Sequence, residues 1–177
     1  TTYGEINTWD VSLITDMSEL FLSKSTFNDG IGNWNVSNVT DMSYMFRAAT
    51  SFNQDLSTWN VSNVINMLDM FAYTDAFNQD ISGWDVSSVT NMETMFRITN
   101  SFNQDISMWD VSNVTNFLFM FIGANALSDE NKCAIQIEFS SNPNWPYDWS
   151  EFCAIDGYTF VPDDNFEQAL IDLGYDD

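Results

Sequence analysis

The sequence predicts an α/β repeat protein whose units stack into a solenoid. Tryptophan recurs at a fixed interval, and so do two phenylalanines, with no insertion anywhere in the first 127 residues. A fixed interval of this size is typical of solenoids, because one unit buries its apolar side chains only against its neighbours. The columns are Trp9, Trp34, Trp59, Trp84 and Trp109; Phe21, Phe46, Phe71, Phe96 and Phe121; and Phe27, Phe52, Phe77 and Phe102.

The first part of each unit predicts a short strand. Leu56, Trp59 and Val61 follow the spacing L-x-x-L-x-L, which is the strand pattern of leucine-rich repeats. Trp59 and Val61 flank one polar residue, so both are expected on the inward face. We therefore expect five strands, centred on residues 9–11, 34–36, 59–61, 84–86 and 109–111, in one parallel sheet.

The second part of each unit predicts a short helix. Val64, Met67, Met70 and Phe71 have the spacing of one apolar helix face. Ser62 or Asn63 can cap the first turn. The predicted fold class is thus a leucine-rich-repeat-like α/β solenoid, with a short parallel sheet on one face and short helices on the other.

The regular interval stops after Leu127, where a C-terminal cap is expected to cover the open end of the stack. Ser128 is the predicted N-cap of a helix that ends near Phe139. Cys133 and Cys153 are expected to form a disulfide bond with each other, and the alternative is that both remain buried thiols. The cap is expected to pack on Leu118 and Phe119. The predicted division is a solenoid over 1–127, a cap over 128–157, and the start of a further module or linker helix over 158–177.

The string FNQDISMWDVSNVTNFLFMF, with its copies over residues 5–127, resembles the repeat of bacterial surface proteins related to BspA-like leucine-rich repeats. This resemblance implies a role at a bacterial cell surface in adhesion and protein binding, without catalytic residues. The string YTFVPDDNFEQALIDLGYDD resembles the start of another leucine-rich-repeat module of the Bacteroidetes. The parent chain is therefore expected to be longer and to contain adjacent repeats, and something is expected to cover the N-terminal face of the first repeat.

Composition argues against several classes of function. The chain has 26 acidic residues, four basic residues and a net charge of −22, so its surface repels nucleic acid and anionic membranes. No apolar run approaches the roughly 20 residues of a membrane span, so no direct membrane insertion is expected. Histidine, a phosphate-binding glycine loop and a nucleophile elbow are all missing from the sequence, which does not indicate an enzyme. No cofactor is expected; the stacked aspartates leave calcium possible and any metal site unknown.

The outward positions of the predicted sheet are the candidate ligand-binding residues. They flank the buried Trp and Val columns, and they are Asp10, Asn35, Thr58, Asn60, Asp85, Met108 and Asp110. Asp85 and Asp110 would lie about one strand spacing apart, so one of them takes a proton, or both share a cation or a basic partner group. The alternative is structural: such aspartates cap turns and form a hydrated polar ladder.

The sequence therefore predicts a non-catalytic binding or adhesion module of a secreted or cell-surface bacterial protein. Its ligand would be a protein or a glycan, bound through the sheet face. The alternative is a structural spacer within a large surface protein. A threonine ladder that could bind ice is less favoured, because Ile65 interrupts Thr40 and Thr90.

Overall fold

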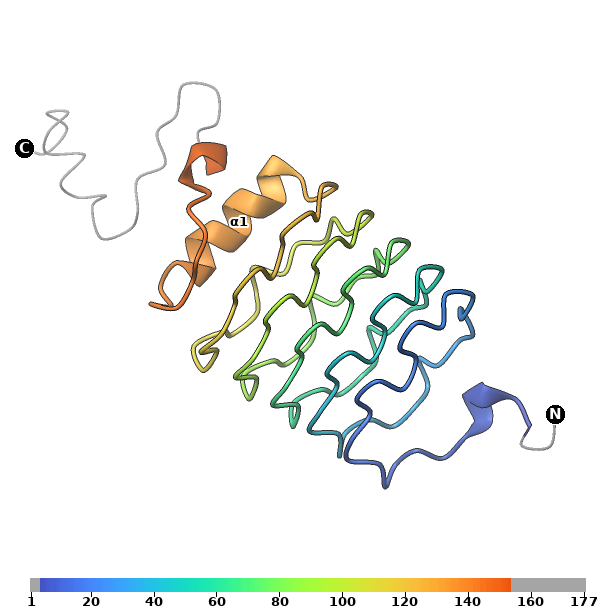
Figure 1. Ribbon diagram of the computed structural model, residues 1–177. Helices are drawn as coiled ribbons and strands as arrows, with labels where there is room; N and C mark the ends of the chain where they lie inside the picture. The colour runs from blue at the N-terminus through green and yellow to red at the C-terminus, as the bar shows by residue number, and fades with distance from the viewer. Residues whose placement is uncertain (1–3, 154–177) are drawn as a thin grey trace, which may run out of the picture.

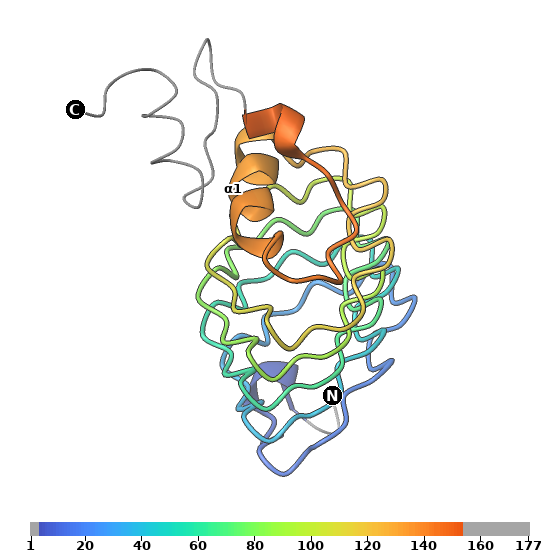
Figure 2. The ribbon, with the colours of Figure 1, turned by 90° about the vertical axis from the view of Figure 1, so that its left-hand side faces the viewer.

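The computed structural model describes residues 4–153. The repeats form coils that stack in chain order, with the N-terminal segment at one end and the only α-helix of the described residues across the other end (Figure 1). This helix, α1, spans Asp129–Phe139, and two short 3₁₀ helices lie outside the stack: η1, Ile6–Thr8, and η2, Ser150–Cys153. Seen from the capped end, successive coils lie behind one another (Figure 2). The described residues form a compact and mostly irregular repeat fold.

The predicted parallel sheet is absent from the described residues. The four parallel bridges between coils are isolated, and they join Asp16, Asp41, Asn66, Asn91 and Asn116 rather than the tryptophan segments. The backbone N–H of Trp59 instead closes a turn on Leu56 O at 3.0 Å, and Val64 closes one on Val61 O. Tight turns on both sides of each Trp-x-Val segment leave no run of residues long enough for a ladder. The predicted alternation is correct, since Trp59 and Val61 are buried and Asn60 is exposed.

The predicted helices in the repeats are also absent, and a row of turns replaces them. In repeat three, Met70, Ala72 and Thr74 donate to the carbonyls of Met67, Asp69 and Phe71, three residues earlier. The residues between them donate to the next coil. Because the N–H groups of these intervening residues already donate to the next coil, they cannot form the i to i−4 bonds of an α-helix. The apolar residues do recur every three to four positions, but this spacing arises from the turns and not from a helix.

The bonds between coils all point in one direction along this row of turns. Met67, Asp69, Phe71 and Tyr73 donate N–H groups to Asn91, Glu93, Met95 and Arg97, at 2.8–3.0 Å. Equivalent bonds link repeats one to two, two to three and four to five. Along this row, the first coil therefore presents free carbonyl oxygens and the last coil presents N–H groups without a further coil to accept them. This polarity decides what can cover each end.

Stacked aromatic rings form the core. Phe46, Phe71 and Phe96 lie over one another, with ring centroids 5.5 and 5.9 Å apart, and Trp84 stacks 6.5 Å from Trp59 and 6.4 Å from Trp109. All of these side chains are nearly or fully buried. Burial of each large side chain contributes about 1.5–3 kcal/mol. The prediction that the tryptophan column is core is confirmed for repeats two to five, whereas Trp9 in repeat one is 44% exposed.

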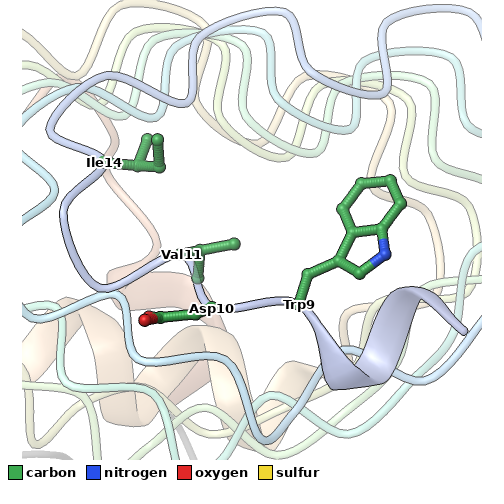
Figure 3. A pocket seen from close by; sticks show the side chains of 4 residues that line it. All are labelled: Trp9, Asp10, Val11 and Ile14. Atoms are coloured by element: carbon green, nitrogen blue, oxygen red, sulfur yellow. The ribbon is translucent and has the colours of Figure 1, made fainter. Parts of the chain in front are cut away.

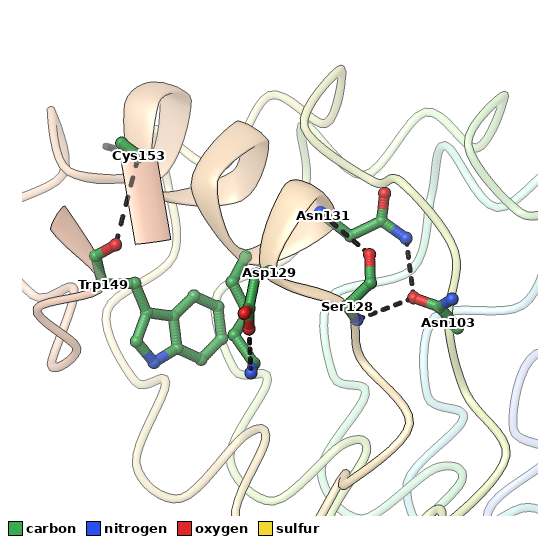
Figure 4. Close-up of polar contacts among 7 residues, drawn as sticks. Asn103, Ser128, Asp129, Asn131, Trp149 and Cys153 are labelled. Carbon is green, nitrogen blue, oxygen red and sulfur yellow. Dashed lines mark hydrogen bonds and ion pairs between the residues drawn. The ribbon is translucent and has the colours of Figure 1, made fainter. Parts of the chain in front are cut away.

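An asparagine ladder joins the coils on another edge. The Oδ1 atoms of Asn28, Asn53 and Asn78 each accept the backbone N–H of the asparagine one repeat later, at 2.8–2.9 Å. The last rung is Asn103, whose Oδ1 accepts the N–H of Ser128 and the side-chain amide of Asn131, both at 2.9 Å (Figure 4). The cap therefore forms the same hydrogen bond to Asn103 that a following repeat would form.

The cap agrees with the sequence prediction in two respects. Ser128 is the N-cap of α1, and its side chain accepts the Asn131 N–H at 3.3 Å. Cys133 and Cys153 form a disulfide with Cα atoms 4.8 Å apart, which joins α1 to η2. Tyr147 supplies its hydroxyl oxygen to the N–H of Phe121 at 2.9 Å, which satisfies one donor of the last coil. The predicted helix within residues 158–177 lies outside the described residues.

The cap does not cover Leu118 and Phe119, and this prediction is wrong. Their side chains are 47% and 50% exposed. The cap instead packs Trp145 against the inward rings of Phe117 and Phe121, at 5.4 and 6.3 Å. The reason is the turn conformation, because it directs Phe117 and Phe121 toward the core end and places the two residues after Phe117 on the surface.

Replacement of Asn142 by aspartate is expected to destabilise the protein by about 1–3 kcal/mol at pH 7. The buried Asn142 amide donates to Val111 O at 2.7 Å and Val114 O at 2.9 Å. An ionised carboxylate has no donor and would face both carbonyl oxygens, so its folded-state pKa is expected to rise. The carboxyl would be tolerated below its unfolded pKa, and stability would fall as pH rises through the folded pKa. Urea unfolding of Asn142→Asp at several pH values measures this; an equal loss for Asn144→Asp would contradict it.

The first repeat presents an open end. No described donor reaches the carbonyl oxygens of Ser18, Leu20 and Leu22, whose equivalents in later repeats accept N–H groups. The first repeat also has a hollow lined by Trp9, Asp10, Val11 and Ile14 (Figure 3). That another repeat, a cap or a partner covers this face stays a prediction. The direction of the bonds along the row of turns adds that a segment covering Ser18, Leu20 and Leu22 would satisfy their carbonyl oxygens with N–H donors.

Candidate functional site

The predicted ligand-binding residues lie on one exposed edge of the stack. Asp85 and Asp110 occupy equivalent positions in successive repeats, and both are exposed. Met108 is the most prominent side chain of the set, at 83% exposure. The whole predicted set is solvent-exposed in the structure: Asp10, Asn35, Thr58, Asn60, Asp85, Met108 and Asp110. Their use by a ligand stays a prediction.

The Asp and Asn side chains of this edge form local turns. Asp85 Oδ1 accepts the backbone N–H of Ser87 at 3.1 Å and its hydroxyl at 2.6 Å. The same bond to the serine two residues later occurs at Asp110, at 3.0 Å. This is the Asx-turn alternative that the sequence left open, and it gives each residue a structural role. Thr58 also has one, because its hydroxyl donates to Gly32 O at 2.6 Å.

These hydrogen bonds keep the carboxyls ionised. The Ser87 hydroxyl, and then its backbone N–H, hold the pKa of Asp85 below its ordinary value despite the neighbouring Asp110. Ser112 lowers the pKa of Asp110 in the same way. Of the alternatives that the sequence left open for this pair, the lowered pKa values favour two ionised carboxyls over a protonated one. Electrostatic repulsion across the edge is outweighed by bonds within each turn.

We expect Ser87→Ala to raise the pKa of Asp85 toward its ordinary value. The substitution removes the hydroxyl bond that lowers this pKa most, and leaves the backbone bond in place. An NMR titration that follows the Asp85 carboxyl carbon measures the change. Asp110 is the internal control, because its own serine is untouched. An unchanged Asp85 pKa would show that the hydroxyl bond is not formed in solution.

Two features that would point to other kinds of function are absent from residues 4–153. These residues contain no group of three or more His, Cys, Asp or Glu side chains that could hold a metal ion. None of the helices in this range is long and apolar enough to cross a membrane.

A second surface follows the rows of turns, on the face where the sequence predicted helices and which it ranked below the sheet face as a binding surface. We call it the turn face: residues 18–23, 43–48, 68–73, 93–98 and 118–123. The backbone there is left-handed at two places in each repeat, with positive φ values of 52–60° for nine non-glycine residues. They are Glu19, Ser23, Tyr44, Ala48, Asp69, Tyr73, Thr94, Ile98 and Phe119, and Gly123 completes the second series.

Left-handed positions with large side chains are costly. This conformation costs a non-glycine residue about 1–2 kcal/mol, and a β-branched residue such as Ile98 is a true outlier. Tyr44, Tyr73 and Phe119 nevertheless occupy positions where glycine would be cheapest. Conformational strain of this kind is concentrated at functional sites. The positive φ values could not be inferred from the sequence, because Gly123 is the one glycine in either series.

The turn face also differs from repeat to repeat, while the core beneath it does not. The first left-handed position carries Glu19, Tyr44, Asp69, Thr94 and Phe119, whereas the buried position before Phe is methionine in repeats two to five. Two of the four basic residues, Arg47 and Arg97, lie on this face beside Tyr73. Variable outward positions on a constant scaffold are typical of recognition surfaces on repeat proteins.

The fold and these surfaces define a repeat protein of stacked coils, with an aromatic core and a disulfide-linked cap. The chain belongs to the DUF285 family, described as a Mycoplasma protein of unknown function, whose profile matches residues 1–85 and again 59–140. It matches neither a curated protein nor a solved structure.

This family assignment corrects the resemblance proposed from the sequence. The chain is a DUF285 protein and not a member of the BspA-like leucine-rich-repeat family. The structure gives the physical reason, since the repeat has neither the strand nor the helix that a leucine-rich repeat would place around the Trp59 and Phe71 columns. The shared feature was the spacing of apolar residues, which different backbones can satisfy.

Proposed function

We propose that the chain is a non-catalytic binding module of a secreted or cell-surface bacterial protein, with a role in adhesion, and that its ligand binds the turn face. The observation that supports this proposal most is the occupation of left-handed positions by Tyr44, Tyr73 and Phe119. Bulky side chains at strained surface positions add nothing to the core, so a role outside folding accounts for them.

One feature supports the extracellular location of the protein, and another supports the turn face as its binding surface. The Cys133–Cys153 disulfide is of the kind that persists in oxidising, extracellular environments. The predicted edge around Asp85 and Asp110 is a weaker candidate surface, because those carboxylates are already bonded to Ser87 and Ser112. On the turn face, by contrast, Phe119 and Ile122 remain 50% and 48% exposed.

The test separates stability from binding. Phe119→Gly and Tyr44→Gly remove a side chain where the backbone favours glycine, so the thermal midpoint should hold or rise. The ligands that bind are first selected from a displayed library of random peptides and from a glycan array. The proposal expects both variants to bind the selected ligands at least about tenfold more weakly. The paired variant Asp85→Asn with Asp110→Asn is the control for the other edge.

The outcomes are distinct. Binding lost in the paired aspartate variant and retained in both glycine variants would move the site to the predicted edge. A spacer within a larger surface protein is the second candidate function, favoured by the asparagine ladder that ties every coil to the next. No selected ligand from either library would favour the spacer.

A further inference from the structure

Three buried polar atoms on the turn face have no hydrogen-bond partner. They are Nε of Arg47, Oδ1 of Asp69 and Nε of Arg97, and no other buried side-chain nitrogen or oxygen in residues 4–153 is left in this state. Buried polar groups in folded proteins are almost always paired, so each exception requires an explanation. The three exceptions fall in adjacent repeats around one side chain, Tyr73.

Tyr73 holds the two guanidinium groups in place. The central carbon of each guanidinium lies 5.5 Å from the Tyr73 ring centroid, Arg47 from repeat two and Arg97 from repeat four. Between them, repeat three has Ala72 at the equivalent position, and this small buried side chain leaves room for the ring. Cation–π contacts at this distance fix the orientation of both arginines. We call Arg47, Asp69, Tyr73 and Arg97 the arginine clamp.

The clamp contains fewer carboxylates than guanidinium groups. Asp69 Oδ2 lies 3.6 Å from Arg47 Nε, and their side chains are 14% and 38% exposed. Arg97 has no ion pair with any described residue. In a chain with 26 acidic and four basic residues, an arginine without a carboxylate partner is unexpected. The missing complement is a carboxylate, because it accepts from the planar guanidinium group in charge-assisted bonds.

The surroundings of the clamp favour a protein ligand over a sugar. A guanidinium lies over Tyr73 from each neighbouring repeat, so its ring is already engaged by the two arginines. Repeat five follows the repeat of Arg97, with Ile98 N–H bonded to Ile122 O at 2.8 Å, and it presents Phe119 and Ile122 to solvent. Arginine, tyrosine and exposed apolar side chains together are typical of the energetic centres of protein–protein interfaces.

We propose that the arginine clamp binds an aspartate or glutamate side chain of a protein partner. The carboxylate accepts hydrogen bonds from the partly exposed side chains of Arg47 and Arg97, while Asp69 Oδ2 stays 3.6 Å from Arg47 Nε. Apolar residues that flank the carboxylate contact Phe119 and Ile122. The inference rests on the proposed binding function and specifies its partner.

The net charge of −22 restricts the partner further. A strongly acidic partner would be repelled during approach, and this repulsion is screened beyond about 8 Å at physiological ionic strength. The partner surface is therefore neutral or basic overall, with a single carboxylate at the contact. This also explains why the clamp consists of two arginines in an otherwise acidic chain.

The experiment uses the whole chain with its disulfide intact. Peptides from a displayed random library are selected on the wild-type protein, and their dissociation constants are measured for wild type, Arg47→Gln and Arg97→Gln. Lys132→Gln is the matched control, because it removes the same charge from the cap, away from the turn face. Circular dichroism and the thermal midpoint verify that each variant is folded. An array of acidic and neutral glycans is tested in parallel.

The inference expects selected peptides to share one Asp or Glu with apolar neighbours. Each arginine variant should weaken binding by about 10-fold or more, the value for loss of one charge-assisted bond, while Lys132→Gln leaves it unchanged. Exchange of the peptide's acidic residue for its amide should weaken binding less in Arg97→Gln than in wild type, because one of the two arginine bonds is already lost. Selected peptides without an acidic residue, or bound equally by the arginine variants, would overturn the inference and leave the binding function standing. Acidic glycans that bind through both arginines, with no peptide selected, would overturn the choice of partner.

Discussion

Phe71→Ala is expected to lower the free energy of unfolding by about 3–5 kcal/mol, the usual range for a phenylalanine removed from a packed core. Its ring lies fully buried at the centre of the stack, 5.5 Å from Phe46, 5.9 Å from Phe96 and 4.0 Å from Phe77. The loss combines burial with contacts to rings in two neighbouring repeats. Urea unfolding monitored by tryptophan fluorescence measures it, because Trp84 lies beside Phe71.

Phe27→Ala is the matched control for this prediction. Phe27 belongs to the same kind of stack but lies at its open end, where its side chain is only half-buried. Because it has a neighbouring coil on one side alone, the same truncation should cost clearly less than at Phe71. Equal losses at both positions would contradict a core held together by stacking between neighbouring coils.

Removal of the disulfide by Cys133→Ala with Cys153→Ala is expected to cost roughly 3 kcal/mol, the entropy of a closed loop of this length. The bond joins α1 to η2 across a sequence separation of 20 residues, and the segment between them includes Trp145, Tyr147 and Trp149, which pack on Phe121. Without the bond, this segment is no longer held at both ends, and its aromatic rings separate from Phe121 more readily. Urea unfolding of the variant and of wild type measures the difference.

A thiol assay supplies the control for the disulfide prediction. Denatured, unreduced wild-type protein should contain no free thiol, and reduced wild type should match the stability of the double alanine variant. Equal stability of oxidised and reduced wild type would mean that the cap is held by its aromatic contacts and that the bond adds little.

Much of the interior could be predicted from the sequence because burial follows residue type and interval. The inward columns represented by Trp59, Val61 and Phe71 were assigned correctly, as were the Ser128 cap and the paired cysteines. The secondary structure could not be predicted in the same way. A spacing such as that of Met67, Met70 and Phe71 says which residues face the core, but helices and successive turns both satisfy it.

The candidate binding surface could be predicted only in part. Arg47 and Arg97 are visible in the sequence as equivalent positions two repeats apart, but Tyr73 belongs to the next column. Its ring contacts both arginines from a left-handed turn position that follows the small side chain of Ala72. Neither the left-handed conformation nor the absence of hydrogen-bond partners for the two arginines can be predicted from the sequence.

By itself, the sequence determined that this protein repeats, which side chains fill its core and where the repeats end. These properties depend on apolar burial, which needs only the right residue at the right interval. The tertiary structure alone decided the backbone of each coil and the surface that it presents. Alternate N–H groups in the row from Met67 to Tyr73 donate within their own coil and to the next one, and the next coil is available because stacking the aromatic core brings it within hydrogen-bonding distance.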